Sequence, residues 1–262
     1  MKRDILVALY SEDTFALSWM AMLMVRDWRT RVAIEAASAS ELAAELSHKH
    51  LTINVLVVDL DLISNLRQVT AEIQRYAEIQ NKDLKVIAVG SQMEPRFFKE
   101  LPHSLIRGYL LKQEISTSLA WAITFATEGK QVFTPSALEG SWRANFPLEK
   151  TRLILNSRSY PGLTERQSEI ARLAIIFSIN RRDLADELKI SDQWSYGVVS
   201  ELYEQLGLGD ILDKTQEFNS VLENDKVIKA HIEEIVEDLG TSRKARDLET
   251  LAFHLLTMPV IE

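Results

Sequence analysis

The sequence predicts an α/β fold, a doubly wound parallel sheet of five strands, followed by an all-α domain with a helix-turn-helix and further C-terminal helices. In the first half of the chain, apolar runs of strand length alternate with stretches of helical periodicity. Proline and glycine break this pattern near the middle, and short helical stretches follow. Nearly continuous apolar strands separated by helices are typical of a parallel sheet that is covered on both faces.

Five apolar runs define the predicted strands, namely residues 5–9, 31–36, 54–59, 85–90 and 106–111. Helical spacing is clear between the third and fourth runs, where Leu66, Val69 and Ile73 share one face. In such sheets, ligands bind at the carboxyl ends of the strands. We therefore expect functional side chains in residues 10–13, 59–61 and 90–91 and at Lys112.

Composition limits the classes of function. The chain has 262 residues, of which 46% are apolar and 26% charged, as in soluble globular proteins. It has no cysteine, no apolar run of membrane-spanning length, no phosphate-binding glycine loop and no nucleophile elbow. We expect a cytoplasmic protein without a membrane partner, a cofactor, a bound metal ion or an enzymatic activity.

The strand that ends "VVD" at Asp59 and the run "GYLLK" that ends at Lys112 carry a resemblance. Together with the order of elements, they resemble the receiver domain of two-component response regulators. The resemblance implies that Asp59 corresponds to the phosphoryl acceptor and Lys112 to the cation of that site. It also implies that Tyr109 is the aromatic residue that reports the state of the site.

Other positions depart from the receiver pattern. Tyr10 and Ser11 stand where the family has an acidic pair, with Glu12 and Asp13 displaced into the loop, and Gly90 replaces a hydroxyl residue. Mg²⁺ needs nearly octahedral oxygen ligands, and phosphoryl transfer depends on the metal, so one carboxylate holds the site poorly. We predict a pseudo-receiver in which Asp59 forms an ion pair. The alternative is a displaced metal site that Glu12 or Asp13 completes.

The sequence divides into a receiver-like domain (1–128), a linker (129–160), a helix-turn-helix domain (161–210) and a C-terminal helical extension (211–262). The linker is indicated by prolines, glycines and broken periodicity. The charge is uneven, because residues 163–262 hold 20 acidic residues and only 11 basic ones. An acidic block repels phosphates, so a nucleic-acid function has to depend on local pattern.

Three helices are predicted in the third segment. Thr164 and Gln167 form a capping box, residues 181–188 form a short helix, and a third helix runs from the N-cap Ser191 to about Leu206. This layout is typical of a helix-turn-helix. The runs "LTERQ", "LADELKIS" and "LYEQLGL" are similar to the LuxR-type (NarL/FixJ-type) DNA-binding domain, which implies that the third helix enters the major groove.

The outward face of the third helix lacks the basic residues that the family usually has there. Val199, Leu202 and Leu206 are expected to face the core. Arg181 and Arg182 are expected to neutralise phosphates, and Gln193 to pair with adenine. The predicted DNA-binding residues are Arg181, Arg182, Gln193, Trp194, Tyr196 and Ser200.

Three functional hypotheses follow, of which the last is an orthodox phosphorylated regulator with the displaced metal site described above. The first is an atypical response-regulator-like transcription regulator, independent of Asp59 phosphorylation, that binds DNA as a dimer. The second is a protein-interaction adaptor in which Trp194 and Tyr196 bind a partner, because exposed aromatic residues are typical of interaction hot spots. Two C-terminal amphipathic helices, the first stopped by Gly240 and the second starting at Ser242, are expected to cover the DNA-binding-like domain, dock on the receiver-like domain or dimerise.

Overall fold

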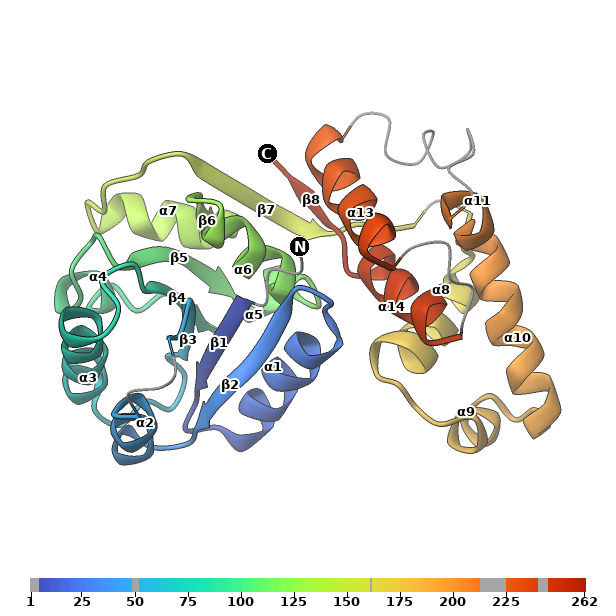
Figure 1. Ribbon diagram of the computed structural model, residues 1–262, viewed down its shortest axis with the longest axis horizontal. Coiled ribbons are helices and arrows are strands. Elements are labelled where there is room, and N and C mark those ends of the chain that lie inside the picture. The colour runs from blue at the N-terminus through green and yellow to red at the C-terminus, as the bar shows by residue number, and fades with distance from the viewer. Residues whose placement is uncertain (1–4, 49–51, 161, 213–224, 240–244) are drawn as a thin grey trace. The chain divides into compact units, whose positions relative to one another are not determined.

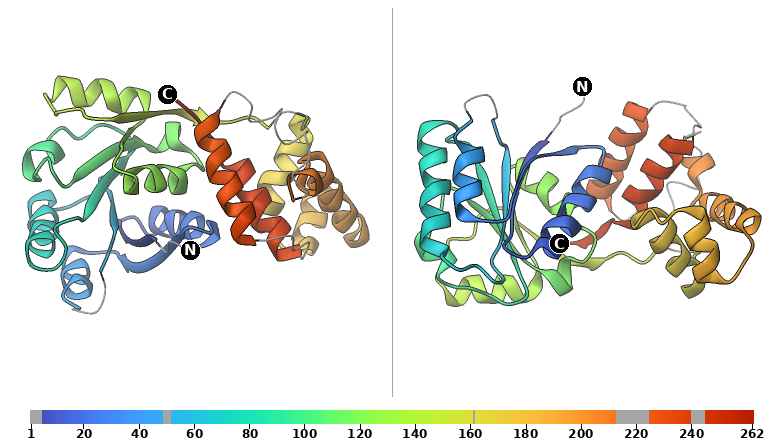
Figure 2. Two further views of the ribbon diagram at one scale, coloured as in Figure 1. Left: turned by 45° about the horizontal axis from the view of Figure 1, so that its top comes forward. Right: turned by 90° about the horizontal axis from the view of Figure 1, so that it is seen from below.

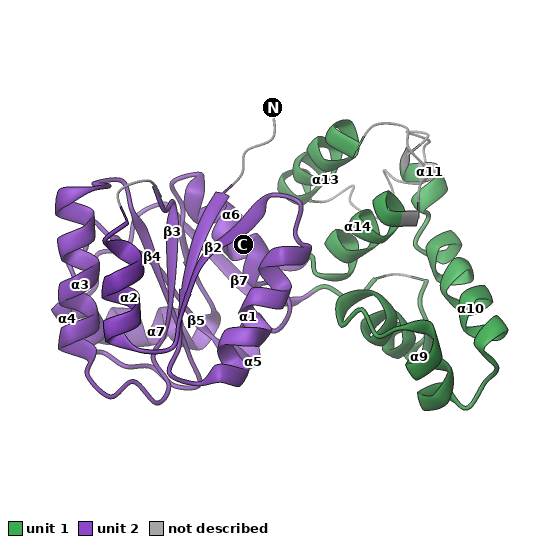
Figure 3. Ribbon diagram, turned by 60° about the horizontal axis from the view of Figure 1, so that its bottom comes forward, with its two compact units in different colours: residues 1–2, 158–258 green, residues 3–157, 259–262 purple. Residues whose placement is uncertain are grey.

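The computed structural model describes residues 5–48, 52–160, 162–212, 225–239 and 245–262. It divides into two compact units (Figure 3). The receiver-like unit comprises residues 3–157 together with 259–262, and the helical unit comprises residues 158–258. The predicted α/β fold followed by an all-α domain is confirmed, and each unit is considered by itself.

The receiver-like unit is built on one sheet with the strand order β2-β1-β3-β4-β5-β6-β7-β8 (Figure 1). All neighbours from β2 to β7 pair in parallel, and β8 pairs antiparallel with β7. The five predicted strands are present as β1 (Ile5–Tyr10), β2 (Thr30–Ala36), β3 (Val55–Asp59), β4 (Lys85–Gly90) and β5 (Ile106–Leu111). The order 2-1-3-4-5 is that of doubly wound flavodoxin-like folds.

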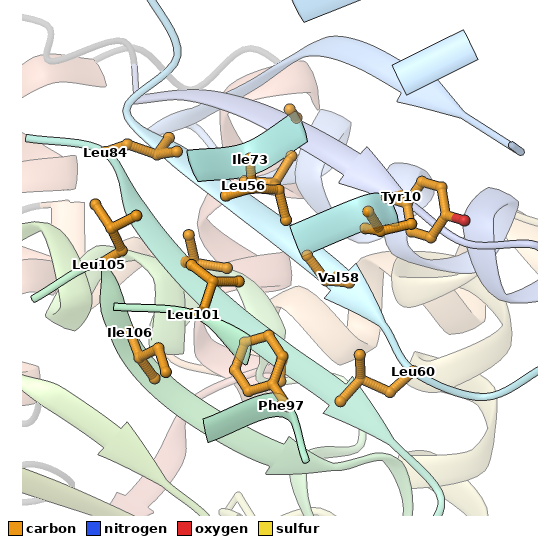
Figure 4. Packing of buried hydrophobic residues seen from close by; sticks show 14 of the residues in the cluster. Tyr10, Leu56, Val58, Leu60, Ile73, Leu84, Phe97, Leu101, Leu105 and Ile106 are labelled. Carbon is orange, nitrogen blue, oxygen red and sulfur yellow. The ribbon is translucent and has the colours of Figure 1, made fainter. Parts of the chain in front are cut away.

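Helices cover both faces of this sheet, as the two views in Figure 2 show. The helices are α1 (Thr14–Arg26), α2 (Ala39–Leu46), α3 (Leu66–Ile79), α4 (Phe97–Glu100), α5 (Lys112–Ile115), α6 (Leu119–Thr127) and α7 (Pro135–Arg143). Residues of α2, α3, α4 and α7 share one buried cluster with alternate residues of the strands. Figure 4 shows Leu56 of β3, Ile73 of α3 and Phe97 of α4 within this cluster. The core thereby fixes the strand ends where the candidate site lies.

The observed sheet has eight strands, three more than the five predicted. The segment expected to be a linker contains β6 (Gln131–Phe133), α7 and β7 (Thr151–Ser157). Gly108 permits this addition to β5, because a Cβ atom there would lie 2.1 Å from the Val132 carbonyl oxygen. In β7, only Ile154 is fully buried, and the other residues are partly or fully exposed. The strand therefore does not need the dense apolar run that marks β1 to β5.

The last strand, β8 (Pro259–Ile261), returns to this sheet after the whole helical unit. In the antiparallel ladder, Ser157 pairs with Pro259 and Ile154 pairs with Ile261. The chain therefore leaves the receiver-like unit at Ser157 and re-enters it beside the same residue. The helical unit is tied to the sheet at both of its ends rather than by a single linker.

The helical unit contains α8 (Glu165–Ala171), the π-helical turn η1 (Arg172–Ile176), α9 (Arg181–Leu188), α10 (Asp192–Gln205), α11 (Leu208–Leu212), α13 (Lys226–Leu239) and α14 (Ala245–Leu256). The C-terminal helices pack inside this unit, since α14 contacts η1, α11 and α13. Ser178, just beyond η1, also donates a hydrogen bond to Glu249 of α14 (3.2 Å). The predicted boundaries Gly240 and Ser242 lie outside the described residues. None of the described helices has the length and apolar character needed to cross a bilayer.

Truncation after Met258 tests the return of the chain to the sheet. The Leu153 N–H donates to the Glu262 carbonyl at 2.9 Å. Losing one such hydrogen bond, worth about 1 kcal/mol, predicts roughly fivefold faster exchange of the Leu153 amide. Hydrogen exchange measures this rate, with the amides of β3 as the internal control. Unchanged protection of Leu153 would show that β8 does not pair with β7 in solution.

Candidate functional site

Asp59 ends β3 at the carboxyl edge of the sheet, and its side chain is fully buried. Three donors satisfy its carboxylate. Oδ2 accepts hydrogen bonds from the Ser11 hydroxyl (2.7 Å) and from Lys112 Nζ (2.8 Å), and Oδ1 accepts one from the Asp61 backbone N–H (3.1 Å). A buried carboxylate needs such partners because desolvation alone disfavours its charge. The predicted ion pair of Asp59 and Lys112 is present.

Lys112 begins α5 directly after β5, and its ammonium bridges two carboxylates. Nζ lies 2.8 Å from Asp59 Oδ2 and 2.8 Å from Asp61 Oδ2. Burial disfavours the charged ammonium, but hydrogen bonds and charges from both aspartates outweigh burial and raise the pKa of Lys112. The ammonium therefore keeps its proton at neutral pH, and one positive charge is shared by two negative ones.

Asp61 lies in the loop after β3 and joins this cluster from the solvent side. Besides Lys112, it binds Ser91 at the end of β4, with the Ser91 hydroxyl 2.6 Å from Oδ2 and the Ser91 N–H 2.9 Å from Oδ1. Burial acts to raise the pKa of Asp61, but these hydrogen bonds outweigh it and hold the pKa below its ordinary value. Asp61 thus stays ionised and links three strand ends.

Glu12 and Asp13 make other contacts. Asp13 caps α1 by accepting from the Phe15 N–H (2.9 Å), and Glu12 accepts from the Tyr10 hydroxyl (2.6 Å) and from Ser64. Burial acts to raise the pKa of Glu12, but the hydrogen bonds from Tyr10 and Ser64 outweigh it and lower the pKa. Both displaced acidic residues thus bind donors other than the Asp59 cluster, namely the start of α1 for Asp13 and Tyr10 and Ser64 for Glu12.

The donor set does not fit Mg²⁺. The receiver family implies a magnesium ion beside the acceptor aspartate, yet here Oδ2 of Asp59 binds the Ser11 hydroxyl and the Lys112 ammonium. Tyr10 and Ser11 stand where the family has its acidic pair, and a hydroxyl supplies no negative charge to a metal ion. Within the described ranges, no three His, Asp or Glu side chains form a group that could hold a metal ion.

Gly90 and Tyr109 lie at the far side of this cluster. A Cβ atom on Gly90 would lie 3.1 Å from the Gln92 carbonyl and 3.3 Å from the Tyr109 hydroxyl, so a larger residue requires movement. Tyr109 is fully buried, donates to the Gln92 carbonyl (2.8 Å) and accepts from the Glu94 N–H (3.0 Å). Burial raises the pKa of Tyr109. The Gln92 carbonyl and the Tyr109 hydroxyl would therefore have to move by a few tenths of an ångström to admit a side chain at residue 90.

In the helical unit, the predicted helix starts are confirmed. Thr164 and Gln167 form the capping box of α8, and the Ser191 hydroxyl accepts from the Trp194 N–H at the start of α10. Lys189 adopts a left-handed conformation (φ 56°) that makes the tight turn between α9 and α10. Burial of Val199, Leu202 and Leu206 confirms the predicted inner face. Ser195 is also buried and donates to the Asp192 carbonyl (2.7 Å), which satisfies its hydroxyl.

The outer face of α10 is exposed and aromatic. Trp194 is 66% exposed and Tyr196 61%, and Gln193 and Ser200 are also exposed. The Arg181 guanidinium, from the start of α9, lies 5.8 Å from the centre of the Tyr196 ring. The structure thus brings Arg181 and Tyr196 together from two helices, as expected for a cation–π contact.

Acidic residues surround this face. Residues 181–205 contain six acidic residues and three basic ones, and none of the basic residues lies in α10. Arg182 is exposed beside Arg181, and both follow the N-cap Asn180. Phosphate contacts from this surface therefore depend on the two arginines at the start of α9 and on Lys189 in the turn before α10.

Sequence reasoning did not assign a role to Ser11, Asp61 or Ser91. All three lie within the predicted strand-end segments, and this position is the one feature of the sequence that could have indicated a role for them. Their partners follow from loop geometry, which brings Ser11 to Asp59 and Ser91 to Asp61.

Replacing Lys112 by Met tests the bridging role. The change leaves Asp59 buried without its counter-charge, and breaking a buried pair in this way costs about 3 kcal/mol or more. Urea unfolding of the receiver-like unit measures the loss, with the exposed Lys99→Met as control. The double variant Lys112→Met/Asp59→Asn should recover most of the lost free energy of unfolding. A loss no larger than that of the control contradicts the bridging role.

Comparisons with known proteins found one similar sequence and several similar solved structures. No protein-family model matches the chain. It is 26% identical over 153 residues to the transcriptional regulatory protein DesR of Bacillus subtilis (strain 168), and the match covers 58% of this chain and 66% of DesR. The chain thus spans slightly less than two thirds of that protein's length.

Solved structures of the response regulator RcsB are also similar. RcsB of Salmonella enterica serovar Typhimurium bound to the P1flhDC promoter is 18% identical with a TM-score of 0.44, covering 78% of this chain and 92% of that chain. Its isolated REC domain is 20% identical with a TM-score of 0.43, covering 52% and 98%. These superpositions are loose, and the sheet is established by its own strand order.

Proposed function

We propose that this protein is a transcription regulator that binds duplex DNA through its helix-turn-helix and does not depend on phosphorylation of Asp59. The second part of this proposal is carried by the missing acidic pair. Ser11 donates a hydrogen bond to Asp59, and Glu12 and Asp13 bind other donors, so few carboxylates are left to hold a metal ion beside Asp59. Without that metal, the charge that develops during phosphoryl transfer is not neutralised.

Two features support DNA binding. The sequence similarity to DesR, which is named a transcriptional regulatory protein, agrees with a helix-turn-helix used on DNA. The α9–α10 surface also has suitable groups, since Arg181 and Arg182 supply positive charge and the exposed Gln193 supplies an amide that pairs well with adenine. Trp194, Tyr196 and Ser200 complete this surface, and we propose that two subunits bind together.

A salt titration of binding to duplex DNA tests this proposal. Two phosphate contacts per subunit predict that log K falls against log salt concentration with a slope of about −2 per subunit. For the variant Arg181→Ala/Arg182→Ala, log K should no longer fall with this slope as the salt concentration rises. The control Arg166→Ala/Arg246→Ala removes the same charge from exposed positions of the same unit and should keep it. Asp59→Asn should bind like the unchanged protein.

No binding at low salt contradicts the DNA-binding role. A difference between Asp59→Asn and the unchanged protein contradicts the independence from phosphorylation.

A second candidate function is a protein-interaction adaptor. The observation that favours it is the exposure of Trp194 and Tyr196 on a helix with no basic residue. Desolvated aromatic residues dominate the energy of many protein interfaces. The adaptor proposal gains support if the protein fails to bind any duplex at low salt while remaining folded.

A further inference from the structure

Three donors from two strand ends converge on the carboxylate of Asp61. They are the Lys112 ammonium (2.8 Å), the Ser91 hydroxyl (2.6 Å) and the Ser91 backbone N–H (2.9 Å to Oδ1 and 3.0 Å to Oδ2). An ammonium, a hydroxyl and a backbone N–H that point at one place form a strong binding site for an oxyanion. In this chain a side chain of the protein itself fills that place.

We propose that Asp61 is an internal ligand that permanently fills an oxyanion cradle formed by Lys112 and Ser91. The cradle is thereby held in its liganded arrangement without an added anion. This inference rests on the proposed independence from phosphorylation, because a phosphoryl group on Asp59 would need the same Lys112 ammonium. The carboxylate of Asp61 is joined to the chain two residues after Asp59, so it binds without the entropy loss of a free anion.

The charges explain why the cradle excludes other anions. Lys112 contributes one positive charge, and Asp59 and Asp61 contribute two negative ones. A second anion therefore meets a net negative charge and finds its donors taken. Removing the Asp61 carboxylate leaves Lys112 paired with Asp59 only, and it opens the Ser91 hydroxyl and N–H to an outside anion.

Asp61→Ala with added formate tests this inference, because formate replaces the group that the substitution removes. The backbone amide resonance of Ser91 is the readout. In Asp61→Ala it should shift on loss of the carboxylate and return in a saturable way toward its original position as formate is added. The unchanged protein should show no such shift, and chloride at equal ionic strength should have no effect on either protein.

The double variant Asp61→Ala/Ser91→Ala is the matched control, with the neighbouring Gln92 amide as its readout. Loss of the hydroxyl donor should weaken formate binding about tenfold, the effect of removing one hydrogen bond to a charged group. The inference is overturned if formate leaves the Ser91 resonance of Asp61→Ala unchanged or shifts it equally in the unchanged protein.

A measurement on the unchanged protein covers the case in which Asp61→Ala does not fold. The Ser91 amide should titrate in step with the Asp61 carboxyl carbon, at a pH below the ordinary range of an aspartate. Independent titration of the two would overturn the inference. None of these measurements uses DNA or a phosphoryl donor, so their failure is distinguishable from failure of the proposed function.

Discussion

The ammonium of Lys112, held between the carboxylates of Asp59 and Asp61, determines what the strand-end crevice can do. Asp59 is fully buried, and a buried carboxylate is tolerated only with a counter-charge and hydrogen bonds. Lys112 supplies the charge, Ser11 supplies a further donor, and Asp61 joins Lys112 to the end of β4. Under the proposed function, these contacts keep Asp59 in an ion pair and not in a metal site.

The second constraint is the way in which the helical unit is attached. Strands β6 and β7 extend the sheet beyond β5, and β8 returns to pair with β7 after the helical unit has been completed. The helical unit is therefore joined to the sheet by two covalent connections, which start from the paired residues Ser157 and Pro259.

Much of the fold could be predicted because its signals are local. The strands from β1 to β5 have dense apolar runs, and the starts of α8 and α10 have capping residues, Thr164 and Ser191, whose side chains bind nearby N–H groups. The short strands β6 and β8 lack such signals. They form because Gly108 admits a close neighbour and because β7 offers a free edge, and both reasons depend on tertiary structure.

In the candidate site, too, some features follow from local sequence and others depend on tertiary structure. Asp59 and Lys112 could be predicted from their positions at strand ends, whereas the parts played by Ser11, Asp61 and Ser91 depend on how the loops fold over them. On α10, the buried residues are those of the predicted inner face. The contact of Arg181 with Tyr196 could not be predicted in this way, because it depends on the angle between α9 and α10.

The most direct test of this account is the intact mass of the protein after incubation with acetyl phosphate and Mg²⁺. An Asp59 carboxylate held by Lys112 and Ser11 predicts an unchanged mass, with an orthodox receiver domain phosphorylated under the same conditions as the positive control. A phosphoryl group found on Asp59 would contradict the account, because it would show that the cluster opens and admits the metal ion.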